Sequence, residues 1–320
     1  MVKFKVREYK SGDSKKIYEL FTEFTPYIRD EKFWVWINRM LSDEKSLIVV
    51  AESGDKIVGH YAVIPQEFLI QNESYKIGFA IHAFIHPDFR STFMIFQITK
   101  RMYKIAKEQA IEAIYGFPNA NFRDIQVKAD KWKQVSLFKA LEKTSFKKSE
   151  NRFNLKKIEK NHSDYYILSE VLDSQSVNQD CLKLRKNLNY YINRYIHHPQ
   201  DLYESFFIEN NGEYLAFIVL KTYQDYDQKI GHLVDYVATE QVTFEEVLIE
   251  VENYFTDKVS KLSFWKFGES QKEILLKKGF KENGFETFLG IKMLSNNHKL
   301  EEKLLNFDNW ELCMGDSDAF

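Results

Sequence analysis

The chain has 320 residues, of which 44% are hydrophobic, 16% aromatic and 29% charged. This length predicts about two domains, and the composition excludes disordered and fibrous proteins. The net charge of −2 disfavours general nucleic-acid binding, which usually shows a basic stripe.

Cysteine content and hydropathy exclude further classes of protein. The two cysteines, Cys181 and Cys313, are too few for a disulfide scaffold or a four-ligand metal site. No apolar run approaches the roughly 18 residues needed to span a bilayer, and the polar start is not typical of a signal peptide. We therefore expect a cytoplasmic protein with no metal, no membrane span and no nucleic-acid partner.

The first half of the sequence alternates strands and amphipathic helices. The apolar spacing of Ile17, Leu20, Phe21 and Phe24 predicts a helix that begins near Asp13. The other elements expected in this half are strands over 3–7, 46–52, 57–70, 75–86 and 113–117, helices over 31–40 and from 88 onward, and a final helix and strand over 124–141.

The second half shows a similar order. Its expected elements are strands over 165–171, 229–238, 262–267 and 284–294, a hairpin of 205–209 and 214–222, and helices over 180–195, 244–255 and 269–278. Asn210-Asn211-Gly212 is a strong type I′ turn signal. The shared order predicts an internal duplication, with domains over 1–145 and 164–296, a connector over 146–163 and a tail over 297–320.

The segment His82-Ala-Phe-Ile-His-Pro-Asp-Phe-Arg-Ser-Thr-Phe-Met94 ends a predicted strand and opens a predicted helix. It resembles the GNAT acetyltransferase superfamily, over roughly residues 2–141. In that superfamily a turn of the form R/Q-x-x-G-x-G/A precedes a helix whose backbone N–H groups cradle the pyrophosphate of coenzyme A. Arg90 keeps the arginine of this turn, whereas Phe93 and Ile95 occupy the glycine positions.

Two further segments are similar to one group of GNAT proteins. The first is Tyr115-Gly-Phe-Pro-Asn119, followed by Lys131-Trp132, and the second is the tail Asn309-Trp-Glu-Leu-Cys-Met-Gly-Asp-Ser-Asp-Ala-Phe320. Many proteins of this group belong to bacterial surface-polysaccharide pathways. The alternation of Trp310, Leu312 and Met314 predicts a tail that packs back onto the protein.

The resemblance implies two tandem GNAT-like domains, each a mixed, mostly antiparallel sheet flanked by helices. It also implies acetyl-CoA or another acyl-CoA as co-substrate. The residues that would bind this co-substrate are Phe84, Ile85, His86, Arg90, Ser91, Thr92, Phe93, Met94 and Asn119.

Amide formation from a thioester needs a base for the amine and an acid for the leaving thiolate. An imidazole with a pKa near 6.5 suits the first role, so His82 is the candidate base, although it could be a hydrogen-bonded core residue. Tyr115 is the candidate acid, and packing is an equal alternative. By analogy with N-myristoyltransferases and some aminoglycoside acetyltransferases, the carboxylate of Phe320, or that of Asp316 or Asp318, is a second candidate base.

The second half lacks an arginine turn, because Val237-Ala-Thr-Glu-Gln-Val-Thr243 stands in its place. We therefore expect this half to cover the first site and to bind the acceptor through Asp235 and Tyr236, with Asp316 or Asp318 from the tail. The expected function is N-acetylation of a primary amine of a small molecule, an amino sugar or sugar nucleotide by resemblance, in a monomer or homodimer. A FemABX-like aminoacyl transferase and a non-catalytic binding module are the alternatives.

Overall fold

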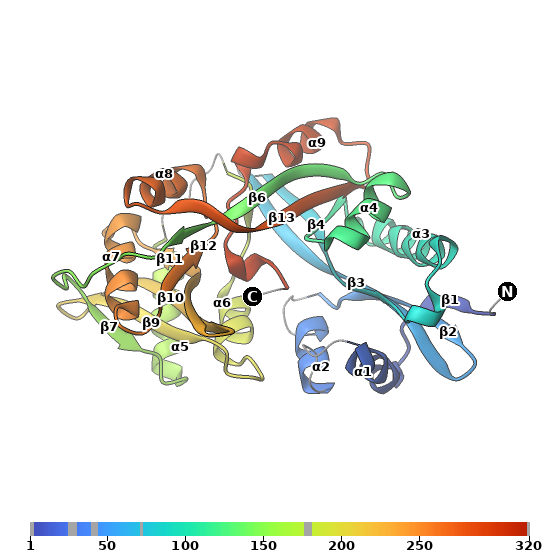
Figure 1. The fold of residues 1–320 in the computed structure, drawn as a ribbon, viewed down its shortest axis with the longest axis horizontal. Coiled ribbons are helices and arrows are strands. Elements are labelled where there is room, and N and C mark those ends of the chain that lie inside the picture. Colours follow the sequence, from blue (N-terminus) through green and yellow to red (C-terminus); the bar gives the residue numbers. More distant parts are fainter. Residues whose placement is uncertain (1–2, 25–30, 40–43, 71–72, 176–180, 319–320) are drawn as a thin grey trace. The chain divides into compact units, whose positions relative to one another are not determined.

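The computed structural model describes residues 3–24, 31–39, 44–70, 73–175 and 181–318 (Figure 1). These residues form two compact units, one of the described residues within 1–137 and 287–307 and the other of those within 138–286 and 308–318. The domain boundary expected at residue 145 thus lies at residue 137. The segment 287–307, which the sequence analysis assigned to the C-terminal half and the tail, belongs to the first unit.

The first unit contains a mixed, mostly antiparallel sheet with the strand order β1-β2-β3-β4-β5-β13. Its strands are β1 (Lys5–Glu8), β2 (Leu47–Ser53), β3 (Lys56–Ile70), β4 (Glu73–Ile85) and β5 (Ala113–Gly116). The sixth is β13 (Lys281–Met293), of which residues 287–293 belong to this unit. Every pairing is antiparallel except that of β4 with β5. The strand β13 closes this sheet, because Gly290–Met293 pair with β5.

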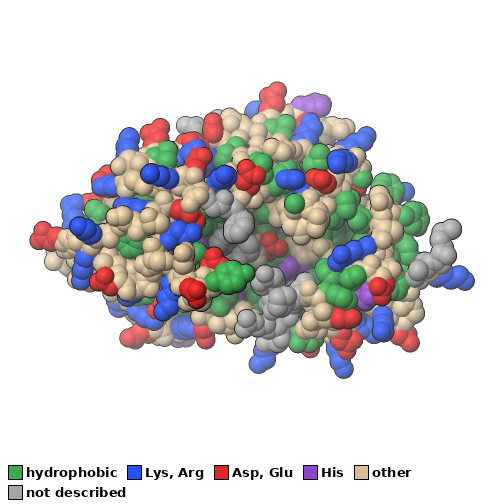
Figure 2. Space-filling model, in the orientation of Figure 1, with side chains coloured by type: hydrophobic (Ala, Val, Ile, Leu, Met, Phe, Trp, Pro, Cys, Tyr) green, Lys and Arg blue, Asp and Glu red, His purple; other side chains and the backbone are tan. Residues whose placement is uncertain are grey.

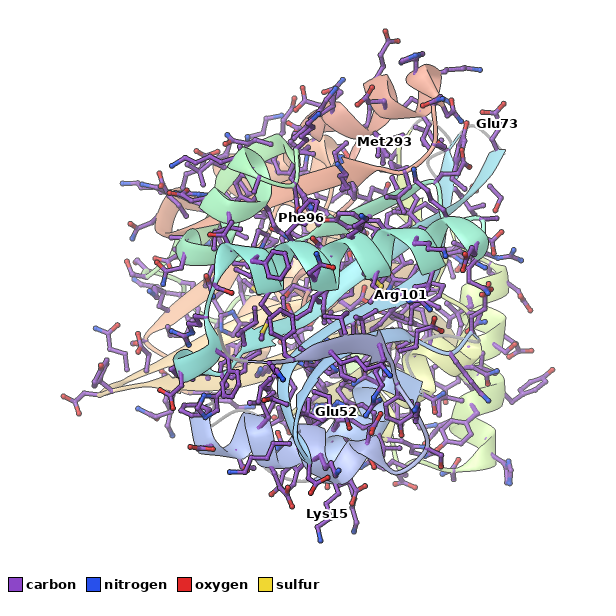
Figure 3. The ribbon with its side chains drawn as sticks, turned by 90° about the vertical axis from the view of Figure 1, so that its right-hand side faces the viewer. Lys15, Glu52, Glu73, Phe96, Arg101 and Met293 are labelled. Atoms are coloured by element: carbon purple, nitrogen blue, oxygen red, sulfur yellow. The ribbon has the colours of Figure 1, made fainter. Side chains whose placement is uncertain are left out.

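Helices cover both faces of this sheet. They are α1 (Asp13–Phe24), α2 (Glu31–Arg39), α3 (Thr92–Glu108), α4 (Ala120–Lys128) and α9 (His298–Leu305). Phe21 of α1 packs on His60, whereas Ile98 of α3 lies over the neighbouring Gly59, so α1 and α3 lie on opposite faces of β3. Figure 3 shows α3 running across the strands, with Phe96 and Arg101 labelled on the helix.

The second unit repeats this arrangement. Its strand order is β6-β12-β11-β10-β9-β7. The strand β6 (Lys133–Lys143) contributes residues 138–143 to this unit. The other strands are β12 (Lys261–Phe264), β11 (Gln228–Ala238), β10 (Glu213–Asp225), β9 (Glu204–Asn210) and β7 (Asn154–Lys157). The helices α7 (Phe244–Phe255) and α8 (Glu269–Lys277) follow β11 and β12, as α3 and α4 follow β4 and β5. Again one central pair, β11 with β12, is parallel. In both units, three consecutive antiparallel strands (β2, β3 and β4, or β9, β10 and β11) are thus followed by a helix, a strand and a second helix.

Two sequence predictions in the second half were wrong. Residues 165–171, expected as a strand, lie in helix α5 (His162–Asp173), whose first turn is capped by Asn161. The helix expected over 180–195 is limited to α6 (Leu188–Tyr191) and the π-helical turn Ile192–Ile196, and a short strand, β8 (Lys183–Leu184), precedes it.

The hairpin of β9 and β10 has the predicted turn. Asn211 and Gly212 both have positive φ angles, 51° and 90°, as a type I′ turn requires. Glu209 stabilises this turn, because its side chain accepts a hydrogen bond from the backbone N–H of Gly212.

Acidic and basic side chains are interspersed over the face of the molecule drawn in Figure 2. This mixture agrees with the near-neutral net charge of the sequence. Within the residues that the structure describes, no helix is both long enough and apolar enough to cross a membrane.

Candidate functional sites in the two units

The parallel strands β4 and β5 separate from one another partway along their length. They pair at Ile77–Ala113, Gly78–Ile114 and Phe79–Tyr115, after which β4 continues to Ile85 and β5 ends at Gly116. The backbone of β4 beyond Phe79 is therefore not paired with β5. Such an opening leaves backbone N–H and C=O groups of β4 for a ligand.

A β-bulge reshapes β4 inside this opening. On β3, His60 is opposite Phe84 and Ala62 is opposite Ile81, so His82 and Ala83 together face the single residue Tyr61. His82 has a positive φ angle of 49°, and its carbonyl oxygen lies 2.8 Å from Nδ1 of His60. Bulges of this kind re-aim side chains and are frequent beside active sites.

The side chain of His82 lies in an apolar environment. Its ring packs on Phe21 at 5.6 Å, and its Nδ1 is enclosed with no hydrogen-bond partner among the described residues. Burial and the neighbouring His60 lower the pKa of His82 to about 3, and burial lowers the pKa of His60 to about 4. Both rings are therefore neutral at pH 7, and His82 is a weaker base than the sequence analysis assumed.

Phe84 and His86 lie on the same side of β4 as His82. Phe24 of α1 packs on Phe84 at 5.7 Å and on His86 at 4.8 Å between ring centres. Helix α1 therefore covers these three side chains, of which that of His86 directly follows β4.

Helix α3 begins directly beyond the end of β4, after the short 3-10 turn Pro87–Phe89. Ser91 caps it, because its Oγ accepts a hydrogen bond of 3.2 Å from the N–H of Met94. The N–H groups of the first helical turn have no partner within a helix, and Thr92 and Phe93 are exposed. The Phe93 ring packs beside Phe4 at 6.0 Å, while the side chain of Met94 is buried in the core.

Arg90 is exposed just before this helix. Its Nε donates a hydrogen bond of 3.2 Å to the carbonyl of Ile85, and its guanidinium lies 5.9 Å from the centre of the Phe84 ring. Arg90 is thus held between the end of β4 and the start of α3. A guanidinium beside a helix N-terminus forms a site for a phosphate group.

Tyr115 and Asn119 have structural partners. Tyr115 is fully buried, stacks on Phe79 at 5.0 Å and donates a hydrogen bond of 2.8 Å to Oε1 of Gln66. Asn119 is the N-cap of α4, since its side chain accepts a hydrogen bond of 3.1 Å from the N–H of Phe122.

The second unit has an equivalent opening between its parallel strands. β11 and β12 pair at Ile230–Lys261 and Gly231–Leu262, after which β11 continues to Ala238. Gly231 of β11 and Gly78 of β4 are at equivalent positions, because each is paired with the second residue of the neighbouring parallel strand. Neither site has room for a side chain, because a Cβ would lie 2.8 Å from the ring of Phe255 at Gly231 and 2.4 Å from Val63 at Gly78.

The tail of the chain packs against this second opening. Trp310 and Leu312 are fully buried. Leu312 and Phe267 exchange backbone hydrogen bonds of 3.0 and 2.6 Å, and Trp310 bridges to Leu182. The last 3-10 turn of the tail, Met314–Asp316, lies against β11.

A pocket of about 330 Å³ remains between the tail and the strand end. Asp235 and Tyr236 of β11, Gln271 of α8, and Glu311 and Asp316 of the tail are among its lining residues. Three of the residues that the sequence analysis assigned to acceptor binding, Asp235, Tyr236 and Asp316, thus share one pocket.

A buried ionic cluster forms the floor of this pocket. The ammonium of Lys186 lies 2.8 Å from Oδ2 of Asp235, 2.8 Å from Oδ1 of Asp316 and 3.1 Å from Sγ of Cys313. Tyr195 donates a hydrogen bond of 2.6 Å to the same Oδ2 of Asp235. Burial alone would lower the pKa of Lys186, but Asp235 and Asp316 raise it well above its ordinary value. Lys186 is therefore charged.

The ligand atoms of Asp235, Cys313 and Asp316 lie within 4.8 Å of one another, close enough to bind one metal ion together. The ammonium of Lys186 already contacts all three groups. Burial raises the pKa of Cys313 well above its ordinary value, which disfavours the thiolate that a metal would bind. These residues therefore suit an ion pair better than a metal.

The structure does not bring every predicted residue to this pocket. Asp318 is partly exposed and is not among the residues that line it. Phe320 lies outside the described residues. Lys186, Cys313 and Tyr195 were missed. Nothing in the sequence around Lys186 shows that it meets Asp235, Cys313 and Asp316, which are 49 to 130 residues away, or that Tyr195 meets Asp235.

Comparison with known proteins relates this geometry to one fold. Residues 5–123 match the family model of the acetyltransferase (GNAT) domain. No curated protein sequence matches the chain.

Several solved structures are similar over most of the chain. A GCN5-related N-acetyltransferase from Anabaena variabilis has a TM-score of 0.67 at 12% identity, covering 92% of this chain and 73% of its own. A probable N-acyltransferase of unknown function from Enterococcus faecalis has a TM-score of 0.67 at 11% identity, with the same coverage. The N-myristoyltransferase of Saccharomyces cerevisiae with bound myristoyl-CoA has a TM-score of 0.61 at 11% identity, covering 91% of this chain and 79% of its own. The chain therefore has a GNAT-like fold, and the likeness extends beyond residues 5–123 into the second unit.

Proposed function

We propose that the protein is an acyl-CoA-dependent N-acyltransferase, most simply an N-acetyltransferase, that acts on a primary amine of a small molecule. The observation that carries this proposal is the opening between β4 and β5, which contains the bulge at His82 and leads into the capped helix α3 beside Arg90. This arrangement combines backbone groups for a thioester arm with a positive site for its phosphates.

The reaction assigns a role to each part of this site. The acceptor nitrogen attacks the thioester carbonyl, the C–N bond forms, the C–S bond breaks and the thiolate of coenzyme A leaves. Backbone N–H groups of Phe84–His86 are the proposed contacts of the carbonyl oxygen. Tyr115 is the proposed proton donor to the thiolate, and it would have to exchange its hydrogen bond to Gln66 for one to sulfur.

The amine must lose a proton in this reaction. Because the pKa of His82 is about 3, its Nδ1 suits accepting a hydrogen bond from the amine better than holding the proton. The proton that the nitrogen releases balances the proton that the leaving thiolate takes up. An amino sugar or sugar nucleotide of bacterial polysaccharide synthesis is the acceptor that we propose from the resemblance of the tail and of residues 115–119.

Arg90→Ala is expected to weaken the binding of acetyl-CoA about 10- to 100-fold, since it removes charge-assisted hydrogen bonds to phosphate. The measurement is a calorimetric titration of the wild-type protein and the variant with acetyl-CoA and with longer acyl-CoAs. Arg101→Ala is the matched control. It removes the same charge from α3, the helix that Arg90 precedes (Figure 3). Arg101 pairs there with Glu8.

Equal affinities of wild-type protein and Arg90→Ala would place the co-substrate elsewhere. If the wild-type protein bound no acyl-CoA, the enzyme proposal would fail and a non-catalytic GNAT-like module would replace it. Phe93 and Ile95, which stand where the family motif has glycines, are the sequence feature that favours this second function.

A further inference from the structure

His60 of β3 is a buried titratable group to which the proposed reaction gives no role. It is 1% exposed, and its Nδ1 lies 2.8 Å from the carbonyl oxygen of His82. Because a carbonyl oxygen can only accept, Nδ1 carries the proton and donates it to this hydrogen bond. The Nε2 of the same ring is enclosed and has no partner among the described residues, which lowers stability. The hydrogen bond to His82 is therefore the feature that accounts for a histidine at this position.

The carbonyl that His60 contacts belongs to the bulge of β4. A bulge interrupts the ladder of backbone hydrogen bonds between two strands. The φ angle of 49° at His82 is also uncommon for a residue with a side chain, and such a conformation persists only where its surroundings hold it. The Nδ1–H of His60 holds it, because this hydrogen bond fixes the peptide plane that joins His82 to Ala83.

This peptide plane sets the direction of the part of β4 that borders the opening. The N–H of His86 donates a hydrogen bond of 2.9 Å to the carbonyl of Val58 on β3. The N–H and C=O groups of successive residues in a strand point alternately to its two sides. The N–H of Ile85 therefore points away from β3, toward the opening. The carbonyl of Ile85 points the same way and accepts the hydrogen bond of Arg90.

The second unit has a bulge in the corresponding strand but no such histidine. On β11, the extra residue Val234 lies between Leu233 and Asp235, which face consecutive residues of β10. The φ angle of Val234 is not positive. The residue of the neighbouring strand just beyond the bulge is His60 in the first unit and Val219 in the second, and valine has no side-chain donor. A bulge in this fold thus does not by itself require a histidine.

We propose that His60 is a positioning residue of the thioester site, whose Nδ1–H holds the bulge at His82 so that the N–H of Ile85 points at the thioester carbonyl. The proposal rests on the proposed N-acyltransferase function and adds to it a residue that touches neither co-substrate nor amine. A preorganised N–H stabilises the negative charge that develops on the carbonyl oxygen. His60 therefore acts on the acyl group through the backbone of β4, and not on the phosphates beside Arg90.

The test is calorimetric titration of full-chain variants with acetyl-CoA and with coenzyme A, which lacks the thioester carbonyl. His60→Leu is expected to weaken the binding of acetyl-CoA about tenfold relative to that of coenzyme A, the effect of one hydrogen bond. His60→Asn should restore the wild-type preference, because its amide nitrogen is bonded to Cγ as Nδ1 is and can donate. A general structural defect would weaken the binding of both compounds together.

His232→Leu is the matched control. His232 is also buried, and its Nδ1 also lies 2.8 Å from a backbone carbonyl, that of Ser263, but in the second unit. This variant loses the same kind of hydrogen bond and should keep the wild-type preference. His60→Met, whose flexible apolar side chain adapts to irregular space, is the non-donor variant to use if His60→Leu does not fold.

An infrared measurement reads the hydrogen bond to the thioester directly. The carbonyl band of acetyl-CoA labelled with carbon-13 at this carbon should move to lower frequency on binding to the wild-type protein and to His60→Asn. In a folded non-donor variant the band should move less, because the N–H of Ile85 no longer points at the carbonyl oxygen.

The inference is overturned if a folded non-donor variant keeps the wild-type preference and band position, if His60→Asn behaves like His60→Leu, or if His232→Leu shows the same loss. In each of these cases the wild-type protein binds acetyl-CoA, and the proposed function stands. A wild-type protein that binds neither compound would overturn the proposed function, and the role of His60 with it.

Discussion

Lys186→Met is expected to lower the free energy of unfolding of the second unit by about 3–5 kcal/mol. The Lys186 side chain is only 9% exposed and contacts Asp235 and Asp316, whose side chains are both 4% exposed. Without the ammonium, two carboxylates would be buried close together with no positive charge between them. Removing one partner of a buried pair leaves such uncompensated charge, which costs far more than a surface pair contributes.

Urea unfolding monitored by tryptophan fluorescence measures this effect, since Trp310 lies in the tail that the cluster holds. Lys183→Met is the matched control. Lys183 also pairs with a tail carboxylate, Glu311, but at 3.5 Å and with side chains that are 31% and 21% exposed. Its loss should cost less than about 1 kcal/mol. Similar unfolding free energies for the two variants would show that the cluster contributes little to stability.

Acidification from pH 7 to pH 5 is expected to destabilise the protein strongly. Burial, as the largest cause, lowers the pKa of His60 and His232 to about 4 and that of His82 and His198 to about 3. In the unfolded chain these groups titrate near 6.5. Between about pH 6.5 and pH 4 the unfolded state therefore binds more protons than the folded state, and the free energy of unfolding falls as the pH falls.

Each of these histidines contributes about 1–2 kcal/mol to this loss at pH 5. Comparing urea midpoints at the two pH values measures the total. His232→Gln should reduce the pH dependence, because this histidine is buried and its Nδ1 lies 2.8 Å from the carbonyl of Ser263. His298→Gln should not reduce it, because that side chain is 89% exposed. A wild-type midpoint that is unchanged between pH 7 and pH 5 would contradict the prediction.

Periodicity predicted most elements of this fold correctly. The apolar stripes of α1, α3 and α7 and the turn at Asn211-Gly212 are local signals, and the structure confirms them. Helix α5 was missed because aromatic and β-branched residues of its sequence favour a strand. The N-cap residue Asn161 and the helical spacing of the apolar residues Ile167, Leu168 and Val171, which are buried on one face, indicate a helix instead.

The two candidate sites differ in how far the sequence revealed them. Arg90 and Ser91 lie in one continuous motif, so the start of α3 could be located from the sequence. The cluster around Lys186 joins three distant segments, and only Asp235 and Asp316 were anticipated. Exposed lysines are far commoner than buried ones, and no local pattern distinguishes Lys186 from Lys183. The tertiary structure alone brings these charges together.

The division of the chain between the units has a consequence for its synthesis on the ribosome. The strand that flanks β5, at Gly290–Met293, follows all of residues 138–286. At typical elongation rates these residues take roughly 7–30 s to be made. During that interval the nascent first unit exposes the unpaired edge of β5, a strand rich in apolar residues and therefore prone to association with other chains. A chaperone that shields this edge would raise the yield of folded protein, and the first unit cannot mature before the second has been translated.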